Sequence, residues 1–156
     1  MKAFMDKEFM LQSPTAQHLY HDYAADMPIC DYHCHIPPRE IYENRRFENI
    51  AQVWLGGRNP DGSYFGDHYK WRVMRSNGVP EEYITGDKPD RERFQKFAEA
   101  LPMAIGNPMY HWTNLELHVF FGYDGVLNGD TAEEVWNLCN DKLQHDPKLT
   151  VRGLIE

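Results

Sequence analysis

Apolar side chains recur every three or four residues along most of the chain, which is the spacing of a helix face. Ser13-Pro14 supplies a capping hydroxyl and a proline suited to a first helical turn. Gly56-Gly57, Pro28 and Asp146-Pro147 are typical helix ends. The helices that this pattern predicts cover about 14–27, 47–55, 67–77, 94–101, 108–121 and 130–145.

Short polar residues mark the starts of several of these helices. Asp67 is predicted to cap the helix that runs to Asn77-Gly78, and Asp130 with Glu133 forms a capping-box pattern. The stretch 58–66 is predicted to be a loop, and 149–156 resembles the first turns of one more element.

Residues 29–36 (ICDYHCHI) break the helical pattern and predict a short buried strand, closed by Pro37-Pro38. A single strand is unusual, because its backbone groups need partners. Either it lies at the edge of something local, or its neighbours lie in sequence outside these 156 residues. We favour the second interpretation.

Two histidines of this predicted strand are the main candidates for chemistry. Side chains alternate along a strand, so His33 and His35 would point the same way, and two imidazoles can converge on one zinc ion. The alternative is two neighbouring histidines on an ordinary strand. A rival site would combine Cys30 and Cys34 with one histidine, which requires a loop; both cysteines are better explained as small buried hydrophobic residues.

Composition excludes several classes of function. The 156 residues carry a formal charge of −8, which argues against nucleic acid and anionic membranes as partners. No apolar run is long enough to span a bilayer, and the first residues do not form a signal peptide. The 3 cysteines are an odd and sparse set that fits a reducing cytoplasm.

A second polar cluster, Asp67-His68-Tyr69, could do acid–base or substrate-binding work, because tyrosine offers an O–H and histidine titrates near neutral pH. The structural alternative is a helix start with an ordinary Asp cap and an inward aromatic ring. Arg72 and Arg75 could bind a carboxylate, although such pairs more often form a solvated face.

The motifs resemble those of one family. DYHCHI followed by Pro-Pro is similar to the first-strand His-x-His signature of the amidohydrolase superfamily, and 67–79 (DHYKWRVMRSNGV), 106–117 (GNPMYHWTNLEL) and the final RGLIE resemble the uronate isomerases. The resemblance implies that His33 and His35 bind a divalent metal, with zinc as the expected ion. It implies that His68 and Tyr69 bind substrate, with Tyr69 also catalytic. The general base and carboxylate-binding residues would lie in later sequence.

The resemblance implies an α/β fold in which residues 1–156 are the N-terminal fragment of a distorted (β/α)₈ metal-dependent barrel. The first strand would be about 29–36, the helical region about 38–145, and the remaining strands absent. The expected reaction interconverts D-glucuronate with D-fructuronate, and D-galacturonate with D-tagaturonate. A barrel needs about 250 residues, so the chain alone should be inactive. A homo-oligomer is left open.

Two other interpretations remain. The chain could be a non-catalytic helical interaction domain whose histidine pair is incidental. It could also be part of a metal-dependent hydrolase, because His-x-His barrels include hydrolases and deaminases.

Overall fold

The computed structural model describes residues 4–30, 32–59 and 61–155, and the chain divides into two units, Met1–Cys34 and His35–Glu156. We describe each unit by itself. Among the described helices, none combines the length and the apolar character needed to cross a membrane.

The first unit contains the predicted N-terminal helix. It consists of α1 (Pro14–Leu19) and a π-helical turn, η1 (Tyr20–Ala24). The Ala16 N–H donates to Ser13 Oγ at 3.1 Å, which confirms the predicted cap. The helix ends at Ala24, before Pro28, and its apolar residues are not buried.

The predicted buried strand over 29–36 is absent from the described residues of that segment, and residue 31 lies outside them. Ile29 is 93% exposed, and Cys30 and Cys34 are also exposed, so the prediction that both cysteines are buried is wrong. The reason is physical: a strand needs neighbours for its N–H and C=O groups, and the two strands described in this structure pair with each other. The boundary between the units falls inside this segment.

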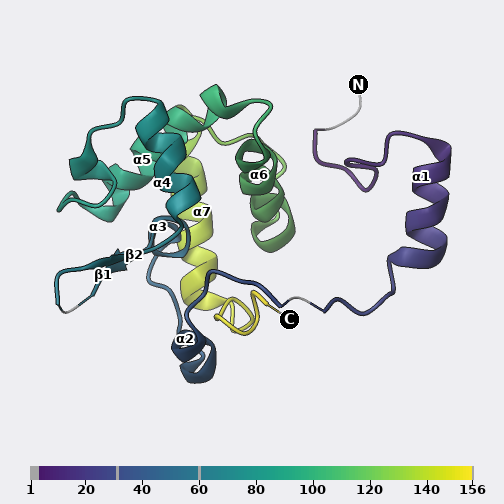
Figure 1. Ribbon diagram of the computed structural model, residues 1–156, viewed down its shortest axis with the longest axis horizontal. Helices are drawn as coiled ribbons and strands as arrows, with labels where there is room; N and C mark the ends of the chain where they lie inside the picture. The colour runs from purple at the N-terminus through teal and green to yellow at the C-terminus, as the bar shows by residue number, and fades with distance from the viewer. Residues whose placement is uncertain (1–3, 31, 60, 156) are drawn as a thin grey trace. The chain divides into compact units, whose positions relative to one another are not determined.

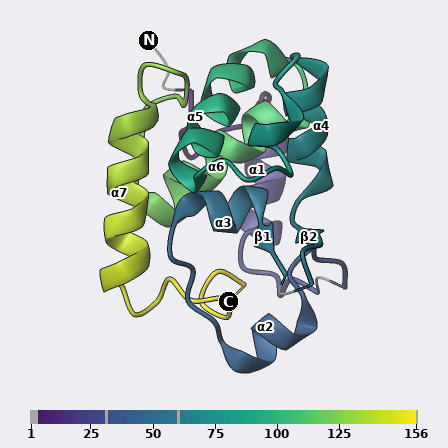
Figure 2. The same cartoon turned by 90° about the vertical axis from the view of Figure 1, so that its left-hand side faces the viewer.

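In the second unit, five helices, α3 to α7, pack around the main apolar core, and α2 lies at its edge without a buried residue (Figures 1 and 2). α5 contacts α3, α4 and α7, and the rings of Phe94 and Phe97 on α5 are fully buried. The helices are α2 (Pro38–Glu43), α3 (Ile50–Leu55), α4 (His68–Ser76), α5 (Asp90–Ala100), α6 (Pro108–Phe121) and α7 (Ala132–His145), with short 3₁₀ turns η2 (Glu81–Tyr83) and η3 (Leu101–Ala104).

Local sequence explains most of these helix starts. The Tyr69 N–H donates to Asp67 Oδ1 at 2.8 Å, and the Met109 N–H donates to Asn107 Oδ1 at 2.9 Å. The predicted capping box of Asp130 is wrong. Instead, the Oδ1 of Asn128 accepts from the backbone of Asp130 and Thr131, and α7 begins after that turn.

The predicted loop over 58–66 contains a small antiparallel hairpin at its ends. β1 (Gly57–Arg58) pairs with β2 (Tyr64–Phe65), with Gly57 opposite Phe65. The two strands are too short to show an alternating pattern in the sequence, which is why the pattern does not predict them.

The end of α3 and the start of α4 approach each other closely. A Cβ on Gly66 would lie 2.4 Å from the Leu55 carbonyl oxygen, so only glycine fits there. The indole N–H of Trp71 and the guanidinium of buried Arg93 both donate to that carbonyl, at 3.0 and 3.3 Å. These contacts place Asp67, which directly follows Gly66, beside α3.

The last described residues form turns, and they contact the α2 region (Figures 1 and 2). The Val151 N–H donates to the Arg45 carbonyl at 3.0 Å, and Arg152 donates to the carbonyls of Ile41 and Tyr42. These hydrogen bonds join the first and the last parts of the second unit.

Candidate functional site

The candidate site begins at the first turn of α4. Because Asp67 caps this helix, the next two residues, His68 and Tyr69, stand on its first turn. Both remain accessible, and the Tyr69 side chain is 46% exposed. Two of the predicted substrate-binding residues therefore reach solvent from a defined helix start.

His35 joins this turn from the segment that precedes α2. Its ring stacks on His68, with centroids 5.4 Å apart, and on Tyr69, with centroids 5.7 Å apart. The ring centroids of His68 and Tyr69 lie 4.3 Å apart. The structure thus brings together three of the four predicted site residues, while His33 belongs to the first unit.

Within the described part of the chain, one group of three side chains could hold a metal ion. His35, Asp67 and His68 each offer a donor atom, and these atoms all lie within 4.8 Å of one another. His35 Nδ1 lies 3.9 Å from Asp67 Oδ1. Two imidazoles and one carboxylate are a donor set that suits zinc and related ions. The residues therefore fit a divalent metal.

The sequence alone does not indicate Asp67 and His68 as metal donors. It predicts Asp67 to be a helix cap, which is confirmed, but the capping oxygen also faces His35. No local spacing signals this, because the two residues come from different segments. The rival cysteine site receives no support from this group, which contains no cysteine. Burial raises the pKa of the remaining thiol, Cys139, to about 12.

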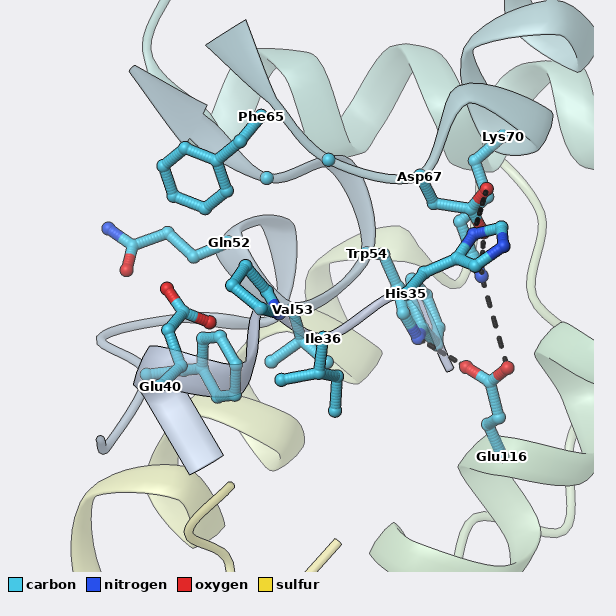
Figure 3. A pocket seen from close by; sticks show the side chains of 14 residues that line it. His35, Ile36, Glu40, Gln52, Val53, Trp54, Phe65, Asp67, Lys70 and Glu116 are labelled. Carbon is cyan, nitrogen blue, oxygen red and sulfur yellow. Dashed lines mark hydrogen bonds and ion pairs between the residues drawn. The ribbon is translucent and has the colours of Figure 1, made fainter. Parts of the chain in front are cut away.

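A cavity of about 200 Å³ opens beside this group (Figure 3). Ile36, Val53 and Phe65 contribute apolar walls. Figure 3 shows the polar wall, in which His35 and Asp67 lie near Lys70, and dashed contacts continue from Lys70 to Glu116. The cavity therefore offers both an apolar surface and charged groups next to the candidate donors.

The two arginines of α4 have partners of their own. Arg75 binds Glu81 through two contacts of 2.5 and 2.8 Å, and the hydrogen bonds from Arg75 and Thr85 lower the pKa of Glu81 to about 2. The guanidinium of Arg72 lies over the Tyr69 ring at 5.7 Å. Arg75 is thus engaged in a structural ion pair, whereas Arg72 contacts a predicted substrate-binding residue.

Comparison with known proteins gives a consistent result. The sequence model of the glucuronate isomerase family matches residues 1–156. The uronate isomerase of Lachnospira eligens is 69% identical over 156 residues, which are 100% of this chain and 31% of that protein. The uronate isomerase of Lachnoclostridium phytofermentans is 58% identical with the same coverage. The chain therefore spans about a third of the length of these relatives.

Solved structures agree. The crystal structure of uronate isomerase from Thermotoga maritima matches with a TM-score of 0.81 and 34% identity, over 96% of this chain and 30% of that one. Glucuronate isomerase from Caulobacter crescentus shows the same fold, with a TM-score of 0.78 and 24% identity, over 99% of this chain and 33% of that one. Because the family model covers the whole sequence, this chain belongs to the glucuronate isomerase family.

Proposed function

We propose that this chain is the N-terminal portion of a uronate isomerase that interconverts D-glucuronate and D-fructuronate, and D-galacturonate and D-tagaturonate. Family membership supports the reaction class. The observation that carries the proposal is the stacked group of His35, His68 and Tyr69 beside Asp67 at the cavity. A ring cluster with accessible polar tips is suited to a small, polar, hydroxylated substrate.

The chain's own residues would bind and orient the sugar acid. Tyr69 carries an O–H that can donate to a sugar oxygen, and His68 offers a ring nitrogen beside it. Interconversion of an aldose with a ketose moves a proton between adjacent carbons. We assign Tyr69 as the catalytic group of this chain, acting through the hydrogen bond from its O–H to the sugar oxygen. The general base would come from sequence beyond this chain.

His33 and His35 are the metal ligands that we propose from the family resemblance. Asp67 and His68 add two donors close to His35. Zinc is the expected ion, and when bound it would polarise a carbonyl or hydroxyl oxygen of the sugar as a Lewis acid. Besides the catalytic role of Tyr69, the roles assigned to this chain are binding and orientation of the substrate by its side chains.

The longer protein is proposed to be a distorted (β/α)₈ barrel of the amidohydrolase superfamily. Residues 29–36 would then become the first barrel strand, because neighbouring strands would supply the partners that its backbone needs. The helices from α2 to α7 would form an extra region after that strand. A cytoplasmic protein that binds neither nucleic acid nor membrane fits the charge of −8 and the sparse cysteines.

A chimera tests this function. In it, this chain replaces the matching segment of the Lachnospira eligens uronate isomerase, which is 69% identical to it. The chimera should convert glucuronate to fructuronate, and the chain alone should give no product above a buffer blank. A folded chimera that lacks isomerase activity would contradict the proposal. If it instead hydrolysed amide or ester substrates, the hydrolase interpretation would replace it, and no catalysis of either kind would favour an interaction domain.

Metal titration tests the ligands separately. We expect zinc to bind the chain alone weakly and the chimera tightly, with His33→Ala and His35→Ala each reducing the affinity of the chimera. If the chain alone binds zinc tightly and stoichiometrically, and neither substitution weakens this binding, His33 and His35 are not the ligands. The alternative site with Cys30 and Cys34 would then be favoured.

A further inference from the structure

Lys70 is a buried cation beside the candidate site. It stands on the first turns of α4, lines the cavity and is only 4% exposed (Figure 3). Lysine is almost never so deeply buried unless it is paired, because removing an ammonium group from water is strongly unfavourable. Its burial therefore calls for compensating partners.

Two carboxylates and one aromatic ring supply this compensation. Lys70 Nζ lies 3.4 Å from Asp67 Oδ2 and 3.9 Å from Glu116 Oε1 on α6. It also lies 5.7 Å from the centre of the Trp54 ring on α3. The ammonium group thus ties together α3, α4 and α6.

Glu116 is itself held in place. Its Oε2 accepts a hydrogen bond from the indole N–H of Trp54 at 2.5 Å, and Trp54 is buried in the core. Glu116 therefore links Lys70 to a buried residue of α3.

The two oxygens of Asp67 have different partners. Oδ2 faces Lys70, whereas Oδ1 accepts the Tyr69 N–H at 2.8 Å and faces His35 Nδ1 at 3.9 Å. A carboxylate that is pinned at one oxygen presents the other in a defined direction. Outer partners of this kind orient the groups that act directly on a ligand.

We propose that Lys70 is a positioning residue, which fixes the carboxylate of Asp67 and, through it, the placement of His35, His68 and Tyr69. This inference rests on the proposed function. Lys70 reaches this group through Oδ2 of Asp67, so its effect on the three rings passes through that carboxylate. A purely structural role would instead make Lys70 one more contributor to stability.

Lys70→Met in the chimera is the principal test. It keeps the length of the side chain and removes the charge. We expect kcat/KM for glucuronate to fall about tenfold, the lower end of what loss of an outer partner causes. Lys96→Met is the matched control, because Lys96 also pairs with a carboxylate three residues away, that of Glu99 at 2.7 Å, but on the surface of α5. It should leave kcat/KM within about twofold.

A double variant separates positioning from general damage. Asp67→Asn keeps an oxygen that can cap α4 but lacks the charge that Lys70 binds. If Lys70 acts through Asp67, adding Lys70→Met to Asp67→Asn should lower kcat/KM by much less than tenfold. If the loss of kcat/KM in the double variant equals the product of the two single losses, the proposal is overturned. It is also overturned if Lys70→Met lowers thermal stability but keeps kcat/KM within about twofold.

Backbone amide exchange in the 156-residue chain tests the same idea without catalysis. Exchange of the Tyr69 N–H should become faster in Lys70→Met and stay unchanged in Lys96→Met. Unchanged Tyr69 exchange in a folded Lys70→Met chain would contradict the positioning role even if the chimera were active. Should Lys70→Met not fold, Lys70→Gln retains a donor without the charge and is held to the same criteria. If the parent chimera is inactive but the exchange pattern is as expected, the proposed function is rejected and the positioning role of Lys70 is retained.

Discussion

Residues 29–36 and α4 both carry candidate site residues, but their backbones find partners in different ways. α4 makes its hydrogen bonds within itself, and Asp67 caps its first turn. The described residues of the segment 29–36 form no strand, and Ile29 is 93% exposed. A helix forms its backbone hydrogen bonds within itself, whereas a strand needs neighbouring strands as hydrogen-bond partners. The part of the site made by α4 and His35 therefore forms within the second unit. Under the proposed barrel, the placement of His33 would depend on further strands.

The largest expected effect is on stability, and it separates the buried core beneath α4 from the segment 29–36. Phe94→Ala removes a fully buried ring that packs against Trp54 and Trp136. Loss of such a ring should lower the free energy of unfolding by about 3–5 kcal/mol. Urea unfolding of the chain, followed by far-UV circular dichroism, measures this.

Ile29→Ala is the counterpart in the exposed segment. We expect a change within about 0.5 kcal/mol, as for other surface substitutions. A loss comparable to that of Phe94→Ala would mean that residues 29–36 are buried in the chain in solution, and the comparison would fail.

Helix caps give an intermediate effect. Asp67→Ala should lower the free energy of unfolding by about 0.5–2 kcal/mol, because the Tyr69 N–H loses its acceptor. Ser13→Ala removes the equivalent cap of α1, a helix without buried residues. The same urea unfolding should show little change for Ser13→Ala. Equal losses would indicate that the two units unfold together.

A small effect is also expected for Glu81, on the surface of the second unit. Hydrogen bonds from Arg75 and then Thr85 lower its pKa from 4.5 to about 2. A lowered carboxyl pKa adds stability above the ordinary value, and this stability is lost as pH falls from about 4.5 through about 2. Because Glu81 is exposed, we expect Glu81→Gln to cost only about 0.2–1 kcal/mol at pH 7. The gap between parent and variant should narrow below pH 4.5, and a gap independent of pH would contradict the ion pair.

Several elements could be predicted from local sequence because their causes are local. The caps at Ser13 and Asp67 lie next to the helices that they begin. The apolar stripes of α3, α5 and α7 could be predicted because helical spacing alone determines which residues share a face.

Other features could not be predicted because they join distant segments. The hairpin of β1 and β2 is too short to leave a pattern. The contacts of Arg93 with the end of α3, and of Lys70 with Glu116, depend on how the helices pack. The same is true of the stacking of His35 on His68, for which the sequence offers two unrelated histidines. In this chain, local signals determine the helices, and packing determines the candidate site.

The central claim is that α4 presents Tyr69 to a substrate and does not merely pack it. Tyr69→Phe in the chimera is the most direct test, because it removes one oxygen and leaves the ring that stacks on His35. Loss of one hydrogen bond to a charged or partly charged group costs about 1.5–3 kcal/mol, roughly a tenfold to hundredfold fall in kcat/KM. Tyr83→Phe, which makes the same change on η2, is the control.

Turnover of glucuronate and thermal unfolding should be measured on the same samples. We expect Tyr69→Phe to lower kcat/KM at least about tenfold with an unchanged melting temperature, and Tyr83→Phe to change neither quantity. His68→Asn should also reduce turnover. A Tyr69→Phe chimera whose kcat/KM stays within about twofold of the parent would show that Tyr69 is structural and would contradict the account.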